Sequence, residues 1–200
     1  MAKYHIYTDG SSRGNPGKGG WATIVMNETE DEVIAIECDY EDYVTNNRME
    51  LKAMICALGF AESHPNDECI IFSDSAYVVN SINSWMRGWA ANGWKNSKKQ
   101  TVENVDLMKG IWDYISRPFF NADVRKCDGH AGNVGNELAD ALAINSRARY
   151  DNLIEFYEIE DKTKDLEPIS LEEGLMLMKA EIATTALLNN QAGDNWNPID

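Results

Sequence analysis

The 200-residue sequence has no uninterrupted apolar run of the roughly 18 residues that a membrane-spanning helix requires. Its first ten residues enter a strand-like pattern directly, so we expect neither a secretory signal nor membrane association. It also lacks any CxxC pair, which argues against a zinc site or a disulfide framework. The four cysteines are therefore expected to be small, buried thiols of a cytoplasmic protein: Cys38, Cys56, Cys69 and Cys127.

Positive charge is scarce, because 18 Lys and Arg stand against 33 Asp and Glu, a formal net charge of −15. A nonspecific nucleic-acid coat would be basic, so that class is disfavoured. The imbalance is uneven: residues 151–200 carry −9, and residues 1–150 carry −6. The segment 85–99 contains four basic residues and no acidic one, which makes it a local basic segment on an acidic chain.

The apolar content is sufficient for a folded core, with 44% hydrophobic and 10% aromatic residues. The composition changes near residue 150. We therefore predict one domain over residues 1–150 and an acidic C-terminal extension over residues 151–200, partly helical over 171–188 and unstructured at its end.

Alternating and apolar patterns predict an α/β fold. Strands are expected at 3–9, 20–27, 32–40, 68–74 and 120–130. Helices are expected at 45–65, 75–85, 102–118 and 135–149, the last with Asn136 as its N-cap. The first three strands form an antiparallel meander in this interpretation. The last two are joined through helices, so they should run parallel in a mixed sheet.

Four carboxylates are candidates for a shared site. Asp9 should end the first strand and Asp74 the buried fourth strand, so neighbouring strands would bring them together. Glu50 begins the apolar stripe of the first long helix, and Asp140 lies one turn into the last helix. Each also has an ordinary explanation: an Asp-Gly turn, an Asn47–Glu50 capping box, or a solvated helix face. Four crowded carboxylates would repel one another, and oxygen ligands of this kind suit Mg²⁺ or Mn²⁺.

Six motifs occur in order: "YTDGSSRGNPGKGGW", "TNNRMEL", "FSDSAYV", "WMRGWAANGWK", "NVDL" and "GHAGNVGNELAD". Together, over about residues 3–148, they make the chain resemble type 1 ribonuclease H, the bacterial ribonuclease HI branch. The resemblance implies a ribonuclease H-like fold, a five-stranded mixed sheet flanked by helices. It also implies an endonuclease that hydrolyses the RNA strand of RNA–DNA hybrids with two Mg²⁺ ions and leaves 5′-phosphate and 3′-hydroxyl ends. Separately, we expect the chain to be a monomer.

The resemblance also implies roles for particular residues. The catalytic residues would be Asp9, Glu50, Asp74, His130 and Asp140, of which the four carboxylates would bind the metal. Recognition of the hybrid's minor groove would involve Gly10, Ser11, Asn15, Thr45, Asn46 and Asn47. A basic handle that grips the DNA strand would contain Trp85, Trp89, Trp94, Lys95, Lys98 and Lys99.

Parts of the handle and the motifs depart from the family pattern. Ala90, Ala91 and Asn92 stand where relatives often carry basic residues, so we expect a weakened handle. Ala76 replaces a polar amide that many relatives carry. The tryptophans also have a packing interpretation, which we favour for Trp85.

Two other functions fit the same sequence features. A same-fold DNA-cleaving resolvase or integrase would also use an acidic cluster, and a non-catalytic hybrid-binding module would use the same recognition surface. Two interpretations are open for the extension: a solubilising tail, or a docking element for a replication-protein partner.

Overall fold

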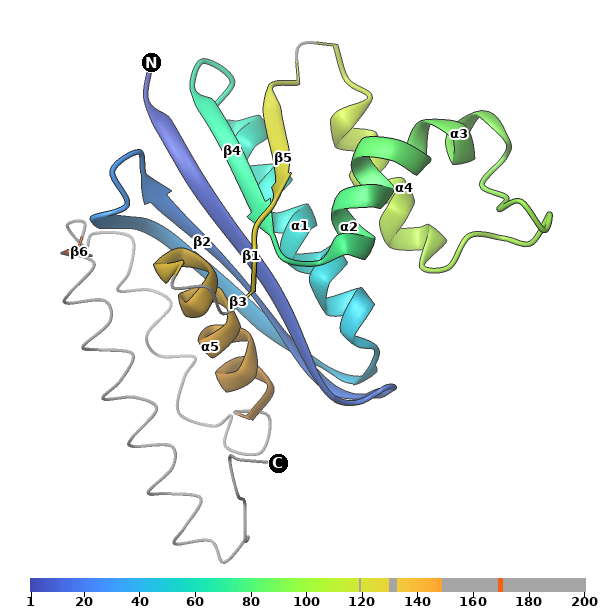
Figure 1. Cartoon of the computed structure of the whole chain (residues 1–200), viewed down its shortest axis with the longest axis horizontal. Coiled ribbons are helices and arrows are strands. Elements are labelled where there is room, and N and C mark those ends of the chain that lie inside the picture. Colours follow the sequence, from blue (N-terminus) through green and yellow to red (C-terminus); the bar gives the residue numbers. More distant parts are fainter. Residues whose placement is uncertain (119, 130–132, 149–168, 171–200) are drawn as a thin grey trace, which may run out of the picture.

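In the computed structural model the described residues are 1–118, 120–129, 133–148 and 169–170, and Figure 1 shows a central twisted sheet with helices on both faces. The sheet order is β5-β4-β1-β2-β3-β6. Its strands are β1 Lys3–Gly14, β2 Gly17–Asn27, β3 Glu32–Val44, β4 Glu68–Ser73, β5 Ala122–Lys126 and β6 Ile169–Ser170. The predicted α/β fold with a five-stranded mixed sheet is confirmed by β1 to β5.

The strand pairing follows the predicted meander and crossovers. β1 pairs antiparallel with β2, and β2 with β3, while β1, β4 and β5 run parallel. The parallel strands need crossover helices, which the intervening segments supply. The two-residue β6 adds an antiparallel edge beside Glu32 and Val33 of β3, and the sequence had not predicted this strand.

The helices are α1 Asn46–Ser63, α2 Ala76–Asn80, α3 Met86–Ala91, α4 Val105–Ile115 and α5 Val134–Ala148, with a π-helical turn, η1, over Ser81–Trp85. In Figure 1, α1 lies on one face of the sheet and α5 on the other, while α2, α3 and α4 gather beside the β4–β5 edge. Within the described segments no helix has both the length and the apolar character needed to cross a membrane.

Two hydrophobic clusters hold these layers together. The larger one joins β1, β4 and β5 to α1, α2 and α4, and includes Ile6, Leu51, Met54, Ile71 and Met108. The smaller one lies under α5 and includes Tyr7, Ile24, Leu138 and Ala139. Because neighbouring residues of β1 point to opposite faces, Ile6 packs in the larger cluster and Tyr7 in the smaller one, and the strand is buried on both faces from Ile6 to Gly10.

Three local predictions are wrong. Asp9 does not end β1, which continues to Gly14 paired with β2. Asn136 does not cap α5: its backbone N–H donates to the Asn133 side chain, so Asn133 is the capping residue. Cys38 is exposed instead of buried, because it lies on the outer strand β3.

Gly20 sets how closely α5 approaches the sheet. A Cβ atom at this position would lie 2.3 Å from the backbone oxygen of Ala143 and 2.6 Å from the backbone nitrogen of Arg147. Both contacts are with helix backbone, which cannot move without displacing α5. The close approach of α5 to β2 therefore requires glycine here.

We expect Gly20→Ala to lower the free energy of unfolding by about 2–4 kcal/mol, because the added methyl group forces α5 away from β2. Gly88 is the matched control: it lies in α3, and a Cβ atom added there would meet nothing within 4 Å. Gly88→Ala should leave stability unchanged or raise it by up to about 1 kcal/mol through helix propensity. Urea unfolding of both variants measures this, and equal effects would contradict the packing argument.

Candidate active site

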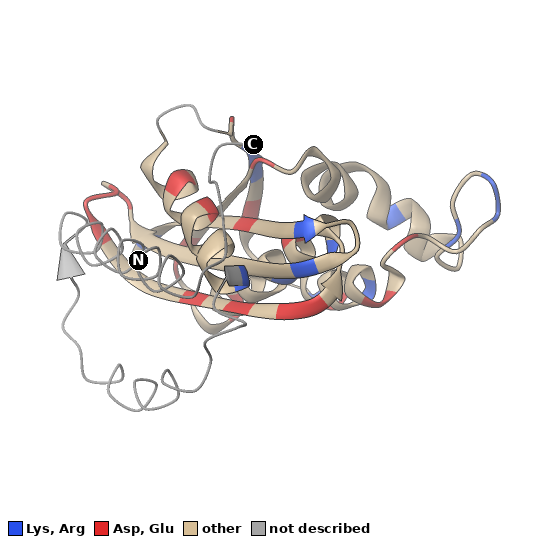
Figure 2. Cartoon of the chain, turned by 90° about the horizontal axis from the view of Figure 1, so that it is seen from below, with Lys and Arg blue, Asp and Glu red and all other residues tan. Residues whose placement is uncertain are grey.

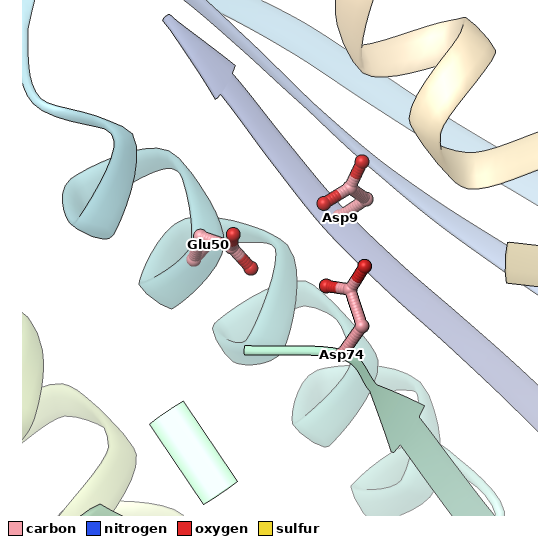
Figure 3. Close-up of side chains that lie close together, drawn as sticks. All are labelled: Asp9, Glu50 and Asp74. Carbon is pink, nitrogen blue, oxygen red and sulfur yellow. The ribbon is translucent and has the colours of Figure 1, made fainter. Parts of the chain in front are cut away.

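Three carboxylates converge where the parallel part of the sheet ends. The β1–β4 pairing stops at Thr8 and Ser73, and Asp9 and Asp74 are the next residues on the two chains. Glu50 reaches the same point from α1 (Figure 3). One ligand oxygen from each of the three carboxylates lies within 4.8 Å of the others. The predicted meeting of Asp9, Glu50 and Asp74 is thus present in the structure.

Gly10 allows α1 to come this close to β1. A Cβ atom on Gly10 would lie 2.2 Å from the backbone nitrogen of Glu50, so only glycine fits between strand and helix. The Asn46 side chain then donates a hydrogen bond of 3.1 Å to Oε1 of Glu50 and orients it. The structure shows no Asn47–Glu50 capping box, because Thr45 occupies the N-cap and makes no side-chain capping bond.

The fourth candidate, Asp140, approaches from α5. Its carboxyl interacts with Asp9 through charge repulsion and a side-chain hydrogen bond. It is therefore an inward-facing residue rather than part of a solvated helix face. The four carboxylates come from β1, α1, the end of β4 and α5, so the site exists only when both helical layers have packed on the sheet.

The crowding changes how these groups bind protons. Burial, followed by the neighbouring Asp74 carboxylate, raises the pKa of Asp9 to about 8. Burial, then Asp9 and Asp74, raises the pKa of Glu50 well above its usual range. Asp9 and Glu50 are only 6% and 7% exposed, so water does little to relieve the repulsion.

A divalent cation fits this donor set. The three grouped ligands are all carboxylates, the oxygen donors that Mg²⁺ and Mn²⁺ prefer. Oε2 of Glu50 is buried and has no hydrogen-bond partner among the described residues. A buried carboxylate oxygen left without a partner is costly, and a bound cation would satisfy it and offset the mutual repulsion.

The loop between β5 and α5 passes directly over Asp74. A Cβ atom on Gly129 would lie 2.7 Å from Oδ2 of Asp74, so a larger residue at this position would displace that carboxylate oxygen. His130, the predicted catalytic histidine, follows immediately but lies outside the described residues. Gly129 was not among the predicted site residues, although its "DGH" context beside His130 was a usable signal.

The predicted minor-groove residues lie around the start of α1. Gly10 and Ser11 follow Asp9 on β1, and Asn15 lies in the β1–β2 turn. Oδ1 of Asn15 accepts a 3.3 Å hydrogen bond from the backbone N–H of Asn46, which joins that turn to the helix. Thr45 and Asn47 flank Asn46, so these residues are close in space as well as in the predicted role.

Arg48 is held in place rather than solvated. Its guanidinium group makes two hydrogen bonds to the Asp106 carboxylate, of 3.0 and 2.7 Å. This bidentate pair raises the pKa of Arg48, lowers that of Asp106, and joins the first turn of α1 to α4.

The basic segment projects from the body as a loop beyond α3, and Figure 2 shows blue positions at its tip. The side chain of Asn96 accepts hydrogen bonds from the backbone N–H groups of Lys98 and Gln100, which tightens the loop. Lys95, Lys98 and Lys99 are exposed on it. Figure 2 also shows acidic positions along β3, so the two charges occupy different regions of the surface.

The structure differs from the prediction in which handle tryptophans are packed and which is exposed. Trp89 and Trp94 pack against the larger hydrophobic cluster. Trp85, for which the sequence favours packing, is 42% exposed and contacts Trp89 with ring centroids 5.6 Å apart. Of these three tryptophans, Trp85 is therefore the most exposed to solvent.

Comparison with known proteins identifies the family. A family model described as RNase H matches residues 1–148. The chain belongs to the ribonuclease H family. Ribonuclease H from Janthinobacterium sp. (strain Marseille) is 46% identical over 144 residues, which cover 72% of this chain and 94% of that protein. Ribonuclease HI from Caulobacter vibrioides is 44% identical, with 70% of this chain and 90% of that protein covered.

Solved ribonuclease H structures share the fold. The structure of LC9-RNase H1, described as a type 1 RNase H with the type 2 active-site motif, is similar with a TM-score of 0.60 and 27% identity. The match covers 74% of this chain and 72% of that chain. The resemblance seen in the sequence motifs is therefore confirmed: the chain is a ribonuclease of the bacterial ribonuclease HI type, and residues 151–200 lie beyond the matched region.

The raised pKa of Asp9 predicts an unusual pH dependence for the metal-free ribonuclease. An unfolded Asp releases its proton near pH 4, whereas folded Asp9 keeps it up to about pH 8. Between these values the folded chain binds more protons, so stability falls as the pH rises. At pH 8 in EDTA, Asp9→Asn should raise the free energy of unfolding by roughly 1–3 kcal/mol, and below about pH 4 the difference should vanish.

Urea unfolding in EDTA over that pH range measures the effect. Asp113→Asn is the matched control, because Asp113 is exposed on α4. Parallel pH profiles for wild type, Asp9→Asn and the control would contradict the repulsion described above.

Proposed function

We propose that this ribonuclease H is an endonuclease that hydrolyses the RNA strand of RNA–DNA hybrids by two-metal-ion phosphodiester cleavage and leaves 5′-phosphate and 3′-hydroxyl ends. The observation that carries the proposal is the cluster of Asp9, Glu50 and Asp74 at the end of the parallel ladder, in a chain of this family. A structural neighbour, LC11-RNase H1, has been solved in complex with an RNA/DNA hybrid; at 21% identity and a TM-score of 0.57 it shares the fold.

The four carboxylates would hold two Mg²⁺ ions, with Mn²⁺ as the alternative metal. Bound there, the ions supply Lewis acidity for activating water and for stabilising the leaving 3′ oxygen. Asp9 is central in this assignment, because it interacts with Asp74 and Asp140 and lies beside Glu50. Asn46 keeps Glu50 turned toward the group.

The remaining residues would bind the substrate and move protons. His130 would transfer a proton or aid product release from the loop that passes Asp74. Asn15, Asn46 and their neighbours would read 2′-hydroxyl groups in the minor groove. The exposed Trp85 and the lysines of the loop would contact the DNA strand by stacking and charge.

Two rival functions are less well supported. A DNA-cleaving resolvase or integrase would also carry an acidic group, but the family match covers residues 1–148 continuously and names ribonuclease H. A non-catalytic hybrid-binding module would gain nothing from burying carboxylates that repel one another and leave Oε2 of Glu50 without a partner among the described residues.

We also propose that the chain consists of two parts. Residues 1–150 would form a monomeric catalytic domain in the cytoplasm, and residues 151–200 an acidic extension. The described part of that extension is β6, which pairs with β3. The predicted helix over 171–188, the unstructured end and the docking of a replication-protein partner lie outside the described residues.

The central test uses labelled RNA–DNA hybrid, double-stranded RNA and double-stranded DNA, each with Mg²⁺ or with EDTA. We expect cleavage of the RNA strand in the hybrid alone, and only with Mg²⁺. Asp74→Asn should reduce the cleavage rate at least about 100-fold, because it removes a proposed metal ligand. Asp123→Asn, an exposed change on β5, is the control. Wild-type cleavage of DNA duplex, or full activity of Asp74→Asn, would refute the assignment.

The few basic residues of the handle predict that hybrid affinity depends only weakly on salt concentration, and added lysines should make that dependence steeper. Ala91 and Asn92 are exposed at the end of α3, directly before the loop that carries the lysines. Replacing both with Lys should tighten hybrid binding and steepen the slope of log affinity against log salt by up to about 2, since each phosphate contact contributes about 0.9.

Asn66→Lys is the control, because Asn66 is exposed in the turn before β4, away from the end of β4 where the carboxylates meet. Binding is measured in Ca²⁺ over a range of salt concentrations. If the handle variant behaved like the control, the loop would not contact the nucleic acid.

A further inference from the structure

Arg147 reaches from the end of α5 to the strand that carries Asp9. Its guanidinium group donates a 2.8 Å hydrogen bond to Oγ of Ser11. This contact is possible because α5 packs on Gly20, the residue that pairs with Ser11 in the sheet. The arginine is therefore positioned by the same close approach that positions Asp140.

Arg147 lies on the same side of β1 and α5 as the carboxylates Asp9 and Asp140. Asp9, Ser11 and Arg13 are alternate residues of β1, so they lie on one face of the strand. Arg147 is seven residues after Asp140, so the two lie on the same face of α5, about 10 Å apart along the helix axis. The face that carries Asp9 and Asp140 thus continues into Arg13 and Arg147.

The two arginines lie close enough to repel each other. Burial, and then the charge of Arg13, lowers the pKa of Arg147, while the charge of Asp140 acts in the opposite direction as the smallest of the three causes. Among the described residues, neither arginine has a carboxylate within ion-pair distance, whereas Arg48, Arg117 and Arg125 each pair with one. A half-buried arginine beside a second arginine, on a chain of net charge −15, leaves a local positive site that favours an anion.

A helix-terminus effect explains only part of this arrangement. A cation in the last turn of a helix gains about 0.3–1 kcal/mol from the helix dipole. That gain accounts for Arg147 at the end of α5, but it explains neither the neighbouring Arg13 nor the turn of Arg147 inward onto Ser11. A ligand with negative charge accounts for all three.

We propose that Ser11, Arg13 and Arg147 form a phosphate subsite that binds the backbone of the cleaved strand beside the carboxylate group. The inference rests on the proposed hybrid-cleaving function and adds to it a binding contact from α5, on the opposite side of the site from the handle. At about 3.4 Å of rise per nucleotide, 10 Å along α5 places the bound phosphate within about three nucleotides of the scissile bond. Arg147 supplies the planar fork that binds phosphate oxygens, and Ser11 orients it.

Hybrid binding by variants in which an uncharged glutamine replaces each arginine tests the subsite. In an Asp74→Asn background, which prevents turnover, Arg147→Gln and Arg13→Gln should each weaken binding roughly 3–10-fold at 0.1 M salt and reduce the salt slope by about 0.9. The double variant should reduce the slope by about 1.8. Arg125→Gln is the matched control: it removes the same charge from β5, where Arg125 pairs with Asp123.

A chemically modified substrate locates the contact. Hybrids with one methylphosphonate in the RNA strand lack one backbone charge at a chosen position. We expect a methylphosphonate at one position within three nucleotides of the scissile bond to weaken binding by the parent protein. The same methylphosphonate should not change the affinity of the Arg147→Gln variant. Arg147→Lys keeps the charge without the fork, so its salt slope should remain that of the parent, and thermal melting checks that each variant is folded.

Two results would overturn the subsite. One is a binding loss and slope for Arg147→Gln equal to those of Arg125→Gln. The other is tighter binding by the arginine variants, which is expected if the arginines instead hold the acidic segment 151–200. Cleavage of hybrid by the wild-type chain, run alongside, tests the proposed function separately, because that activity does not depend on the subsite being correct.

Discussion

The carboxylates of the site repel one another, and the rest of the structure holds them together against that repulsion. Asp9 and Glu50 are almost fully buried beside Asp74, and burial together with neighbouring charge raises the pKa of both Asp9 and Glu50. Such a group would disperse if the chain around it were free to move. It stays together because each carboxylate is fixed to an element that is packed for independent reasons: β1, α1, the end of β4 and α5.

Glycine and asparagine do much of this fixing. Gly10 admits the first turn of α1 to within contact of β1, Gly20 admits α5 to β2, and Gly129 lets a loop pass Asp74. Asn46 orients Glu50 and is itself tied to the β1–β2 turn through Asn15. Residues that the resemblance implied for substrate recognition therefore also support the proposed metal ligands, so substitutions at Asn15 or Asn46 would disturb both at once.

The charge of the molecule is distributed for contact with a polyanion despite its acidic total. Acidic positions follow β3, away from the carboxylate site, while the exposed lysines lie on the loop beyond α3 (Figure 2). The pair Arg13 and Arg147 adds a second positive position on the other side of the carboxylates. A hybrid bound between these positions would contact positive charge on both flanks, and the weakened handle would be compensated from α5.

The sequence alone indicated the family, the order of β1 to β5 with α1, α2, α4 and α5, and the four candidate carboxylates, because alternation, helical periodicity and short motifs are local properties of the chain. It also identified β4 as a buried central strand, which indicated that Asp9 and Asp74 lie close together.

The local signals failed where tertiary pairing extended an element. Asp9 looked like a strand end because Asp-Gly favours turns, yet pairing with β2 carries β1 on to Gly14. The predicted cap Asn136 lies inside α5, because the helix begins at Val134 and the Asn133 side chain accepts the bond from the Asn136 backbone N–H. Contacts between residues far apart in sequence could be decided only by the tertiary structure, because no local pattern encodes them: the bond from Arg147 to Ser11 across 136 positions, the Arg48–Asp106 pair, and the edge strand β6 on β3.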